Sequence, residues 1–152
     1  MALTNTVSTS IQSTLTGTAE LASQKATVTE TTQTGLTTVA TDSIYTDDGI
    51  IAGGATSIDL SGSLTDPLNN TVIFAKVMTV YIKNKSTNDM TIGGANNIPI
   101  FADGSDLLNL AAGAVFMYID ETGILVTAGT GDLITITGTN GDTFDLVVIG
   151  AA

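Results

Sequence analysis

The strongest constraint on the fold is a series of short apolar segments, separated by glycine-containing turns, that fills the second half of the chain. Val, Ile and Thr recur in these segments, and such β-branched residues favour pleated strands because their side chains are stiff at χ1. The glycines between the segments suit turns that need a positive φ. Many short strands at near-regular spacing, with no helical pattern between them, predict an antiparallel β-sandwich that is jelly-roll-like.

The predicted strands follow one another along the chain. They cover residues 57–61, 75–85, 90–92, 107–110, 114–119, 124–127, 133–137 and 143–149. Asn140-Gly141 lies between the last two segments and predicts a β-hairpin there, because Asn-Gly is favoured in two-residue hairpin turns. Asp47-Asp48-Gly49 also predicts a turn, since Asp and Gly dominate tight turns.

The longest predicted strand, residues 75–85, is apolar on both faces. Alternation places Val77 and Tyr81 on one face, and Val80 and Ile82 on the other. A strand of this kind suits the centre of a sandwich or a contact with a neighbouring subunit.

A second segment, residues 114–119, is also apolar on both faces. Phe116 and Tyr118 share one face and lie opposite Val115 and Met117. The pattern fits a contact between molecules, and a sandwich interior explains it equally well.

The composition changes near Asp47, because the preceding part of the chain is rich in Thr, Ser and Gln and sparse in apolar residues. We predict an extended N-terminal arm over residues 1–44, which adds strands or reaches neighbours, and a β-sandwich body over residues 45–152. Apolar residues recur at every fourth position from Leu3 to Leu15, which fits a helical stripe and also one face of a strand. The many threonines favour the strand.

Apolar positions in both parts are predicted to lie at protein–protein interfaces. They are Leu3, Val7, Ile11, Leu15, Val77, Tyr81, Phe116 and Tyr118. The composition supports covered surfaces, because 43% of the residues are hydrophobic and only 12% are charged, whereas average proteins contain about 25% charged residues.

The charge of the chain argues against two classes of partner. Fifteen acidic residues against four lysines give a formal net charge of -11, which phosphate backbones and anionic membranes repel. We therefore predict neither nucleic acid nor membrane as a partner. No apolar run approaches the roughly 20 residues that span a bilayer, and residues 1–10 lack the basic and apolar regions of a secretory signal.

The chain contains no histidine, cysteine or tryptophan, and its four basic residues are all lysines. We therefore predict no enzyme, no cofactor and no metal. A glycosidase could pair Asp120 or Glu121 with Asp132, but platforms for stacking sugars are scarce. Asp47-Asp48 and residues 103–106 place oxygen ligands in loops that suit calcium, without the spacing of a calcium-binding loop. Acids in solvated turns explain all these positions more simply.

Several segments together carry a resemblance to a known family. They are residues 58–84 (IDLSGSLTDPLNNTVIFAKVMTVYIKN), Gly93-Gly94, residues 112–116, residues 123–131 (GILVTAGTG) with Leu133, and residues 143–150 (TFDLVVIG). In order and spacing they resemble small virion structural proteins of tailed bacteriophages. The resemblance covers roughly residues 45–150 and consists of strands and turns, so no functional residue is carried over from it.

This resemblance implies a capsid cement or decoration protein, β-rich and trimeric. Such a protein is made in the host cytoplasm, binds the major capsid protein on the exterior of the virion head, and stabilises the shell without chemistry. Two alternatives stay open: a tail-fibre, spike or adhesin module that binds a host surface ligand, and a small carbohydrate-active enzyme.

Overall fold

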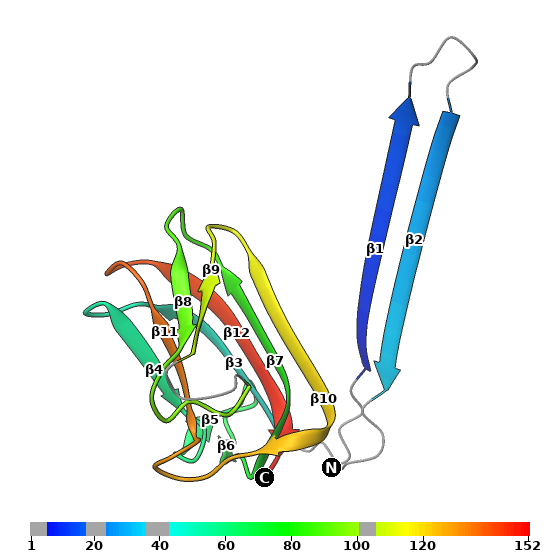
Figure 1. The fold of residues 1–152 in the computed structure, drawn as a ribbon. Helices are drawn as coiled ribbons and strands as arrows, with labels where there is room; N and C mark the ends of the chain where they lie inside the picture. Colours follow the sequence, from blue (N-terminus) through cyan, green and yellow to red (C-terminus); the bar gives the residue numbers. More distant parts are fainter. Residues whose placement is uncertain (1–5, 18–23, 36–42, 101–105) are drawn as a thin grey trace. The chain divides into compact units, whose positions relative to one another are not determined.

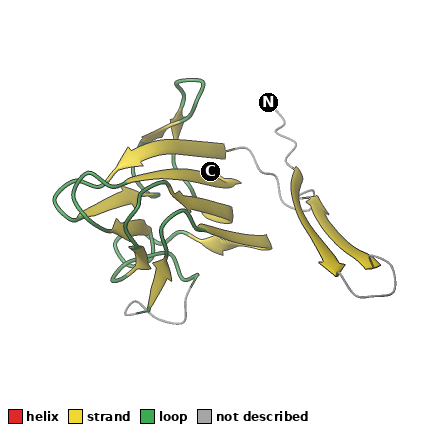
Figure 2. Cartoon of the chain, turned by 90° about the horizontal axis from the view of Figure 1, so that it is seen from above, coloured by secondary structure: helices red, strands yellow, loops and turns green. Residues whose placement is uncertain are grey.

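The structure is a computed structural model that describes residues 6–17, 24–35, 43–100 and 106–152. The chain divides into two compact units, one of residues Thr4–Thr37 and the other containing Thr38–Ala152. The regular elements of the described residues are all strands (Figures 1 and 2), and no helix long and apolar enough to cross a membrane occurs among them. The division between the units falls somewhat before the predicted end of the arm at residue 44.

The N-terminal unit is a β-hairpin, seen as the blue ribbon of Figure 1. Strand β1 (Thr6–Gly17) pairs antiparallel with β2 (Gln24–Gly35) along the whole length of both, beginning with Thr6 opposite Gly35. Threonine-rich segments suit strands because β-branched side chains fit a pleated surface. In its described residues the arm is thus a two-stranded ribbon.

The body consists of eight longer strands and one small pair. The longer strands are β3 (Ser43–Ile50), β4 (Ala55–Asp59), β7 (Lys76–Asn84), β8 (Met90–Gly93), β9 (Leu107–Leu110), β10 (Val115–Leu125), β11 (Leu133–Thr137) and β12 (Thr143–Ala151), and the small pair is β5 (Leu64–Thr65) with β6 (Thr71–Val72). Most of the predicted segments coincide with these strands, although β10 joins two segments that were expected to be separate.

The eight longer strands form two four-stranded antiparallel sheets in the orders β10-β7-β12-β3 and β4-β11-β8-β9. Their pairing is nested: the first strand pairs with the last (β3 with β12), the second with the second-last (β4 with β11), then β7 with β10 and β8 with β9. Nested pairing across two sheets is the topology of a jelly roll. The predicted antiparallel, jelly-roll-like β-sandwich is confirmed.

The hydrophobic core lies between the two sheets. Its fully buried large side chains are Ile51, Leu60, Val77, Val80, Ile82, Met90, Ile134, Ile136, Phe144, Leu146 and Val148. Alternate residues of each sheet supply them, as expected for strands with one face turned to a core. Each such side chain stabilises the fold by about 1.5–3 kcal/mol through burial alone.

A buried amide links the two sheets at one end of the sandwich. Asn84, the last residue of β7, is completely buried, and its Nδ2 donates hydrogen bonds to the carbonyl oxygens of Leu110 at 3.0 Å and Ala111 at 3.1 Å. The same nitrogen lies 2.8 Å from the carbonyl oxygen of Asn88. Leu110 is the last residue of β9, which lies in the opposite sheet. The Asn84 side chain therefore satisfies carbonyl groups of a segment that does not pair with β7.

An irregularity in β7 changes which residues face the core. The pairing with β12 shifts register between Thr79 and Val77, which leaves Met78 as an extra residue. A β-bulge of this kind inverts the alternation of the strand beyond it. Val77 is therefore fully buried in the core. The prediction that it shares a face with Tyr81 is wrong, and within one chain it offers no surface to a partner.

Strand β3 includes residues that were predicted to form a turn. Asp47, Asp48 and Gly49 pair in regular register with β12, where Phe144 lies opposite Gly49. A Cβ atom at Gly49 would overlap the ring of Phe144. Glycine is therefore required here for close packing within a strand, and the turn prediction is wrong.

The turn predicted at Asn140-Gly141 is present, but it does not close a hairpin. Gly141 has a φ of 94°, and the N–H of Asp142 donates to the carbonyl oxygen of Thr139 at 3.0 Å. However, the strands on either side, β11 and β12, belong to different sheets. Pairing with strands distant in sequence overrides the local hairpin signal.

Candidate interaction surface

The outer face of the sheet β10-β7-β12-β3 is mainly apolar. Its central row contains Met117, Tyr81, Val147 and Thr46, which lie side by side across all four strands. The neighbouring row contains Ile119, Thr79, Ile149 and Ile44. We call the group Ile44, Tyr81, Val115, Met117, Ile119, Val147 and Ile149 the apolar outer face.

The apolar outer face is most accessible along β10, which is an edge strand of the sheet. Val115 is 50% exposed and Met117 is 36% exposed, while Tyr81 and Val147 are half-buried. Contiguous apolar surface on a soluble protein marks a site of protein contact. A long edge strand also offers unpaired backbone groups to another strand.

A hydroxyl group on this side of the sheet has no hydrogen-bond partner among the described residues. Thr79 is only 3% exposed, and its Oγ1 forms no hydrogen bond with any described residue. Burial of an unpaired hydroxyl is unfavourable by about 1–3 kcal/mol. The Thr79 hydroxyl therefore lowers the stability of the sheet.

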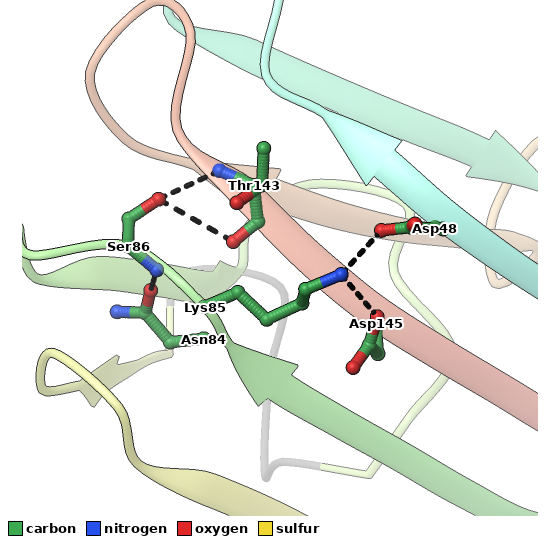
Figure 3. Close-up of polar contacts among 6 residues, drawn as sticks. All are labelled: Asp48, Asn84, Lys85, Ser86, Thr143 and Asp145. Carbon is green, nitrogen blue, oxygen red and sulfur yellow. Dashed lines mark hydrogen bonds and ion pairs between the residues drawn. The ribbon is translucent and has the colours of Figure 1, made fainter.

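One end of the same face carries charged side chains that form ion pairs. Lys85 Nζ lies 2.7 Å from Asp48 Oδ1 and 3.0 Å from Asp145 Oδ1, as Figure 3 shows. The hydrogen bond to Asp48, followed by that to Asp145, raises the pKa of Lys85 above its ordinary value. Ser86, next in the chain, accepts a hydrogen bond from the N–H of Thr143 at 2.6 Å. The apolar rows therefore end in a cluster of one lysine and two aspartates, with a net charge of -1.

The outer face of the other sheet is mainly polar. One row crosses all four strands and contains Ala55, Thr137, Thr91 and Asn109. In the adjacent pair, Ser57 Oγ and Thr135 Oγ1 lie 2.9 Å apart and share a hydrogen bond. We call the group Ser57, Thr91, Asn109, Thr135 and Thr137 the polar outer face. Such hydroxyl and amide groups are satisfied by each other and by solvent.

Several carboxylates of the body accept hydrogen bonds in turns. Asp132 is buried and accepts hydrogen bonds from the N–H of Gly129 at 2.6 Å and from Ser61 Oγ at 2.9 Å. Asp142 is also buried and accepts one from Asn88 Nδ2 at 2.9 Å. The Gly129 N–H lowers the pKa of Asp132, and the Asn88 amide lowers the pKa of Asp142. Hydrogen bonds likewise lower the pKa values of Asp66 and Asp120.

The lowered pKa values keep these acids ionised at neutral pH. A general acid of a glycosidase needs the opposite, a pKa raised toward the operating pH. Asp120 lies in the irregular part of β10 and accepts hydrogen bonds from Thr122 N at 2.8 Å and Thr122 Oγ1 at 2.7 Å. No group of three acids able to hold a metal ion occurs within the described ranges, and most of residues 103–106 lie outside them.

A cleft of about 630 Å³ lies beside Asp120. Its polar lining residues include Asn96, Asn97, Tyr118, Asp120, Thr127 and Thr130. Tyr118 OH donates a hydrogen bond to Asp120 Oδ2 at 3.3 Å, and burial, more than the nearby carboxylate, raises the pKa of Tyr118. Neither Glu121 nor Asp132 lines this cleft, so no pair of the acids considered for a glycosidase faces across it.

The predicted interface residues fall in different places. Val77 is in the core, and Phe116 and Tyr118 are partly buried and pack against the core from β10. Tyr81 lies on the apolar outer face, and Leu3 lies outside the described residues. The remaining three, Val7, Ile11 and Leu15, lie in β1.

The prediction omitted the outward residues of β10 and β12. Val115 and Met117 were recognised as one face of an apolar strand, but the sequence does not show which face is covered by the core. Val147 belongs to an uninterrupted apolar segment, residues 146–149, in which alternation is hidden. Only the pairing of β12 between β7 and β3 assigns Val147 to the outer face.

The fold and these surfaces define the protein as a small jelly-roll β-sandwich preceded by a β-hairpin. Comparison with known family models, with curated proteins and with solved structures finds no match in any of the three.

Proposed function

We propose that the protein is a structural component of a bacteriophage virion, a cement or decoration protein that binds the major capsid protein of the assembled head and forms a homotrimer. The observation that carries this proposal is the apolar outer face, which one chain leaves partly exposed on its edge strand β10. The resemblance of the sequence pattern to small virion proteins suggests the biological setting.

The proposed mechanism is a shift of the assembly equilibrium. A protein that binds the closed shell and not the dispersed subunits stabilises the shell by mass action. Stable protein–protein interfaces bury about 1,200–2,000 Å² in total, and apolar sheet faces contribute such area without chemical groups. The ionised, hydrogen-bonded acids described above support a role that does not involve catalysis.

The direct test compares particles with and without the protein. Particles that lack it should lose their contents at lower temperature and after milder osmotic shock, and adding the purified protein back should restore resistance. Equal resistance of both kinds of particle would contradict the proposal. Met117→Lys, added back in place of the wild type, should fail to restore resistance if the apolar outer face binds the shell. Thr137→Lys, on the polar outer face, is the control and should restore it.

A second candidate function is a tail-fibre, spike or adhesin module, and the cleft beside Asp120 favours it. Asparagine amides, a tyrosine hydroxyl and a carboxylate line this cleft, and such groups can bind a polar ligand such as a glycan. Antibody labelling of particles distinguishes the two functions. Label on the head supports the cement role, whereas label on the tail, with ligand binding lost in Asn97→Ala, supports adhesion.

A further inference from the structure

The cleft beside Asp120 has walls that are fixed by hydrogen bonds of their own. One wall is the loop after β8, where Asn97 Oδ1 accepts a hydrogen bond from the N–H of Thr135 at 2.8 Å. Another is the turn between β10 and β11, which is closed by the N–H of Thr127 donating to the carbonyl oxygen of Gly131 at 3.0 Å. A cleft that is formed before binding costs little reorganisation when a ligand enters.

The lining of the cleft combines apolar side chains with carboxylates. Ile98 and Ile124 are buried lining residues, and Leu125 is 63% exposed. Asp106 and Asp120 also line the cleft, and no lysine occurs among its described lining residues. Such a cleft repels anions and suits a ligand that has an apolar stem and a cationic end.

The Asp120 carboxylate has room for one further hydrogen-bond donor. Its Oδ1 accepts two hydrogen bonds, from Thr122 N at 2.8 Å and Thr122 Oγ1 at 2.7 Å, whereas Oδ2 accepts a longer one from Tyr118 OH at 3.3 Å. The Thr122 hydroxyl, more than any other group, lowers the pKa of Asp120 and keeps it ionised. An ammonium group needs one carboxylate oxygen, while the guanidinium fork binds best to both. The remaining capacity at Oδ2 therefore fits lysine better than arginine.

The aromatic lining of the cleft favours a lysine over a sugar. Tyr118 is the one aromatic side chain among the described lining residues. It is partly buried against the core, which leaves little of its ring for a sugar to stack on. A lysine stem needs only aliphatic surface, such as that of Pro99 and Leu125.

The charge of the body favours a lysine from a different protein. Residues 43–152 carry twelve acids and three lysines, a net charge of -9. Two of these lysines are engaged within the body, because Lys85 pairs with two aspartates and Lys76 Nζ lies 3.4 Å from the carbonyl oxygen of Thr122. A second copy would bring another acidic body to the cleft, whereas a protein that presents lysines is attracted to it.

We infer that the cleft beside Asp120 binds a lysine side chain of the major capsid protein, with the ammonium group on Asp120 and the aliphatic stem along Pro99 and Leu125. The inference rests on the proposed assembly function and adds a charged contact with the shell to the apolar one. A contact of this kind contributes specificity, because only a lysine at the correct point of the shell reaches the carboxylate.

Nuclear magnetic resonance of the isotope-labelled full-length protein tests the cleft with small probes. The probes are the capped tripeptide Gly-Lys-Gly and two analogues in which norleucine or arginine replaces the lysine. We expect the lysine peptide to shift the amide signals of Leu125 and Gly131. It should bind at least about tenfold more tightly than the norleucine peptide, which lacks the charge, and more tightly than the arginine peptide.

A pair of variants separates the carboxylate of the cleft from the overall charge. Asp120→Asn keeps an oxygen for the hydrogen bonds from Thr122 but removes the charge, so it should bind the lysine peptide at least about tenfold more weakly. Asp66→Asn is the matched control, because Asp66 is also hydrogen-bonded in a turn and lies outside the cleft. It should bind like the wild type, and circular dichroism checks that both variants are folded.

The same variants are then added to particles that lack the protein. Asp120→Asn should bind these particles at least about tenfold more weakly than Asp66→Asn, while both form the same oligomer in sedimentation equilibrium. Dissociation of the oligomer by Asp120→Asn alone would assign the lysine to a second copy and overturn the inference.

Two outcomes of the probe experiment would also overturn it. In the first, the norleucine or the arginine peptide binds as tightly as the lysine peptide. In the second, maltotriose, a neutral oligosaccharide, shifts the amide signals of the cleft and the lysine peptide does not. Shell stabilisation is measured separately. If the protein stabilises shells but Asp120→Asn behaves like its control, only the inference fails. If the lysine peptide binds in the cleft but particles without the protein are equally resistant, the proposed function fails.

Discussion

The two sheets of the body differ on their outer faces although they share one core. A row across the first sheet contains Met117, Tyr81, Val147 and Thr46, whereas a row across the second contains Ala55, Thr137, Thr91 and Asn109. Both sheets need apolar residues on their inner faces only, because one covered face is sufficient for an antiparallel sheet. The apolar residues outside the first sheet are therefore not required by the sandwich.

This difference shows that, within the same strands, one set of residues determines the fold and another set indicates the function. The inward residues are explained by the core, and the threonine-rich outer face of the second sheet is typical of a solvated sheet. The apolar outer face of the first sheet is the surface that we propose a partner covers. The following predictions test that distinction, beginning with the largest expected effect.

Removal of a core side chain should damage both sheets together. Phe144 is fully buried and lies against Gly49 of β3, so we expect Phe144→Ala to lower the free energy of unfolding by about 3–5 kcal/mol. Chemical denaturation, followed by circular dichroism, measures the change. A loss below about 1 kcal/mol would show that the two sheets do not depend on one core.

Removal of the amide that links the sheets should have the next largest effect. Asn84→Ala leaves the carbonyl groups of Leu110 and Ala111 without their side-chain donor. We expect a destabilisation of about 2–3 kcal/mol, because buried polar groups without partners are costly. Asn109→Ala, on the exposed polar outer face, is the control and should stay within about 0.5 kcal/mol of the wild type.

The outer faces should respond differently to the same new charge. We expect Met117→Lys to weaken subunit association at least about tenfold, which corresponds to about 1.4 kcal/mol, because a charge would be buried at the contact. Thr137→Lys should leave association unchanged. Sedimentation equilibrium measures both variants. Equal effects, or no effect of Met117→Lys, would show that the apolar outer face is not an interface.

Removal of the unpaired hydroxyl of Thr79 should have a small effect of opposite sign. Thr79→Val keeps the shape of the side chain and removes a buried oxygen without a partner among the described residues. We expect the free energy of unfolding to rise by about 1 kcal/mol, the lower end of the penalty for an unpaired buried hydroxyl. Thr135→Val, which breaks the hydrogen bond to Ser57, should not increase stability.

Acidification should weaken the turns that support both sheets. The pKa of Asp142 is lowered in the folded protein, chiefly by the Asn88 amide, so the unfolded chain takes up a proton more readily than the folded one. The contribution to stability is complete above the unfolded pKa of about 3.9 and is lost as the pH falls through the folded pKa. Thermal unfolding between neutral pH and pH 3 should therefore show a decreasing midpoint. Asp142→Asn should reduce this pH dependence of the midpoint. An unchanged pH dependence would contradict the proposed contribution of Asp142.

Much of the fold could be predicted from the sequence, because strand spacing and glycine turns are local signals. The jelly-roll-like sandwich and most of its strands were predicted correctly. Errors arose where a long-range partner decides the outcome. Gly49 was predicted in a turn but lies in a strand against Phe144, and the bulge at Met78 moved Val77 into the core.

The candidate surface was harder to predict for the same reason. Strand β10 was seen to be apolar on both faces, but only the pairing with β7 shows that Phe116 and Tyr118 face the core while Val115 and Met117 face outward. In β12 the uninterrupted apolar run conceals which residues face outward. A surface of this kind has no sequence motif, because it makes contact through apolar area and not through particular chemical groups.

The central claim is that the apolar outer face of the sheet β10-β7-β12-β3 is covered by protein in the working assembly. An image of the assembled virion, at a resolution that places the chain, tests it most directly. We predict that the protein lies on the head and that Val115, Met117 and Val147 are in contact with a neighbouring polypeptide. A chain located on the tail, or on the head with this face open to solvent, would contradict the account.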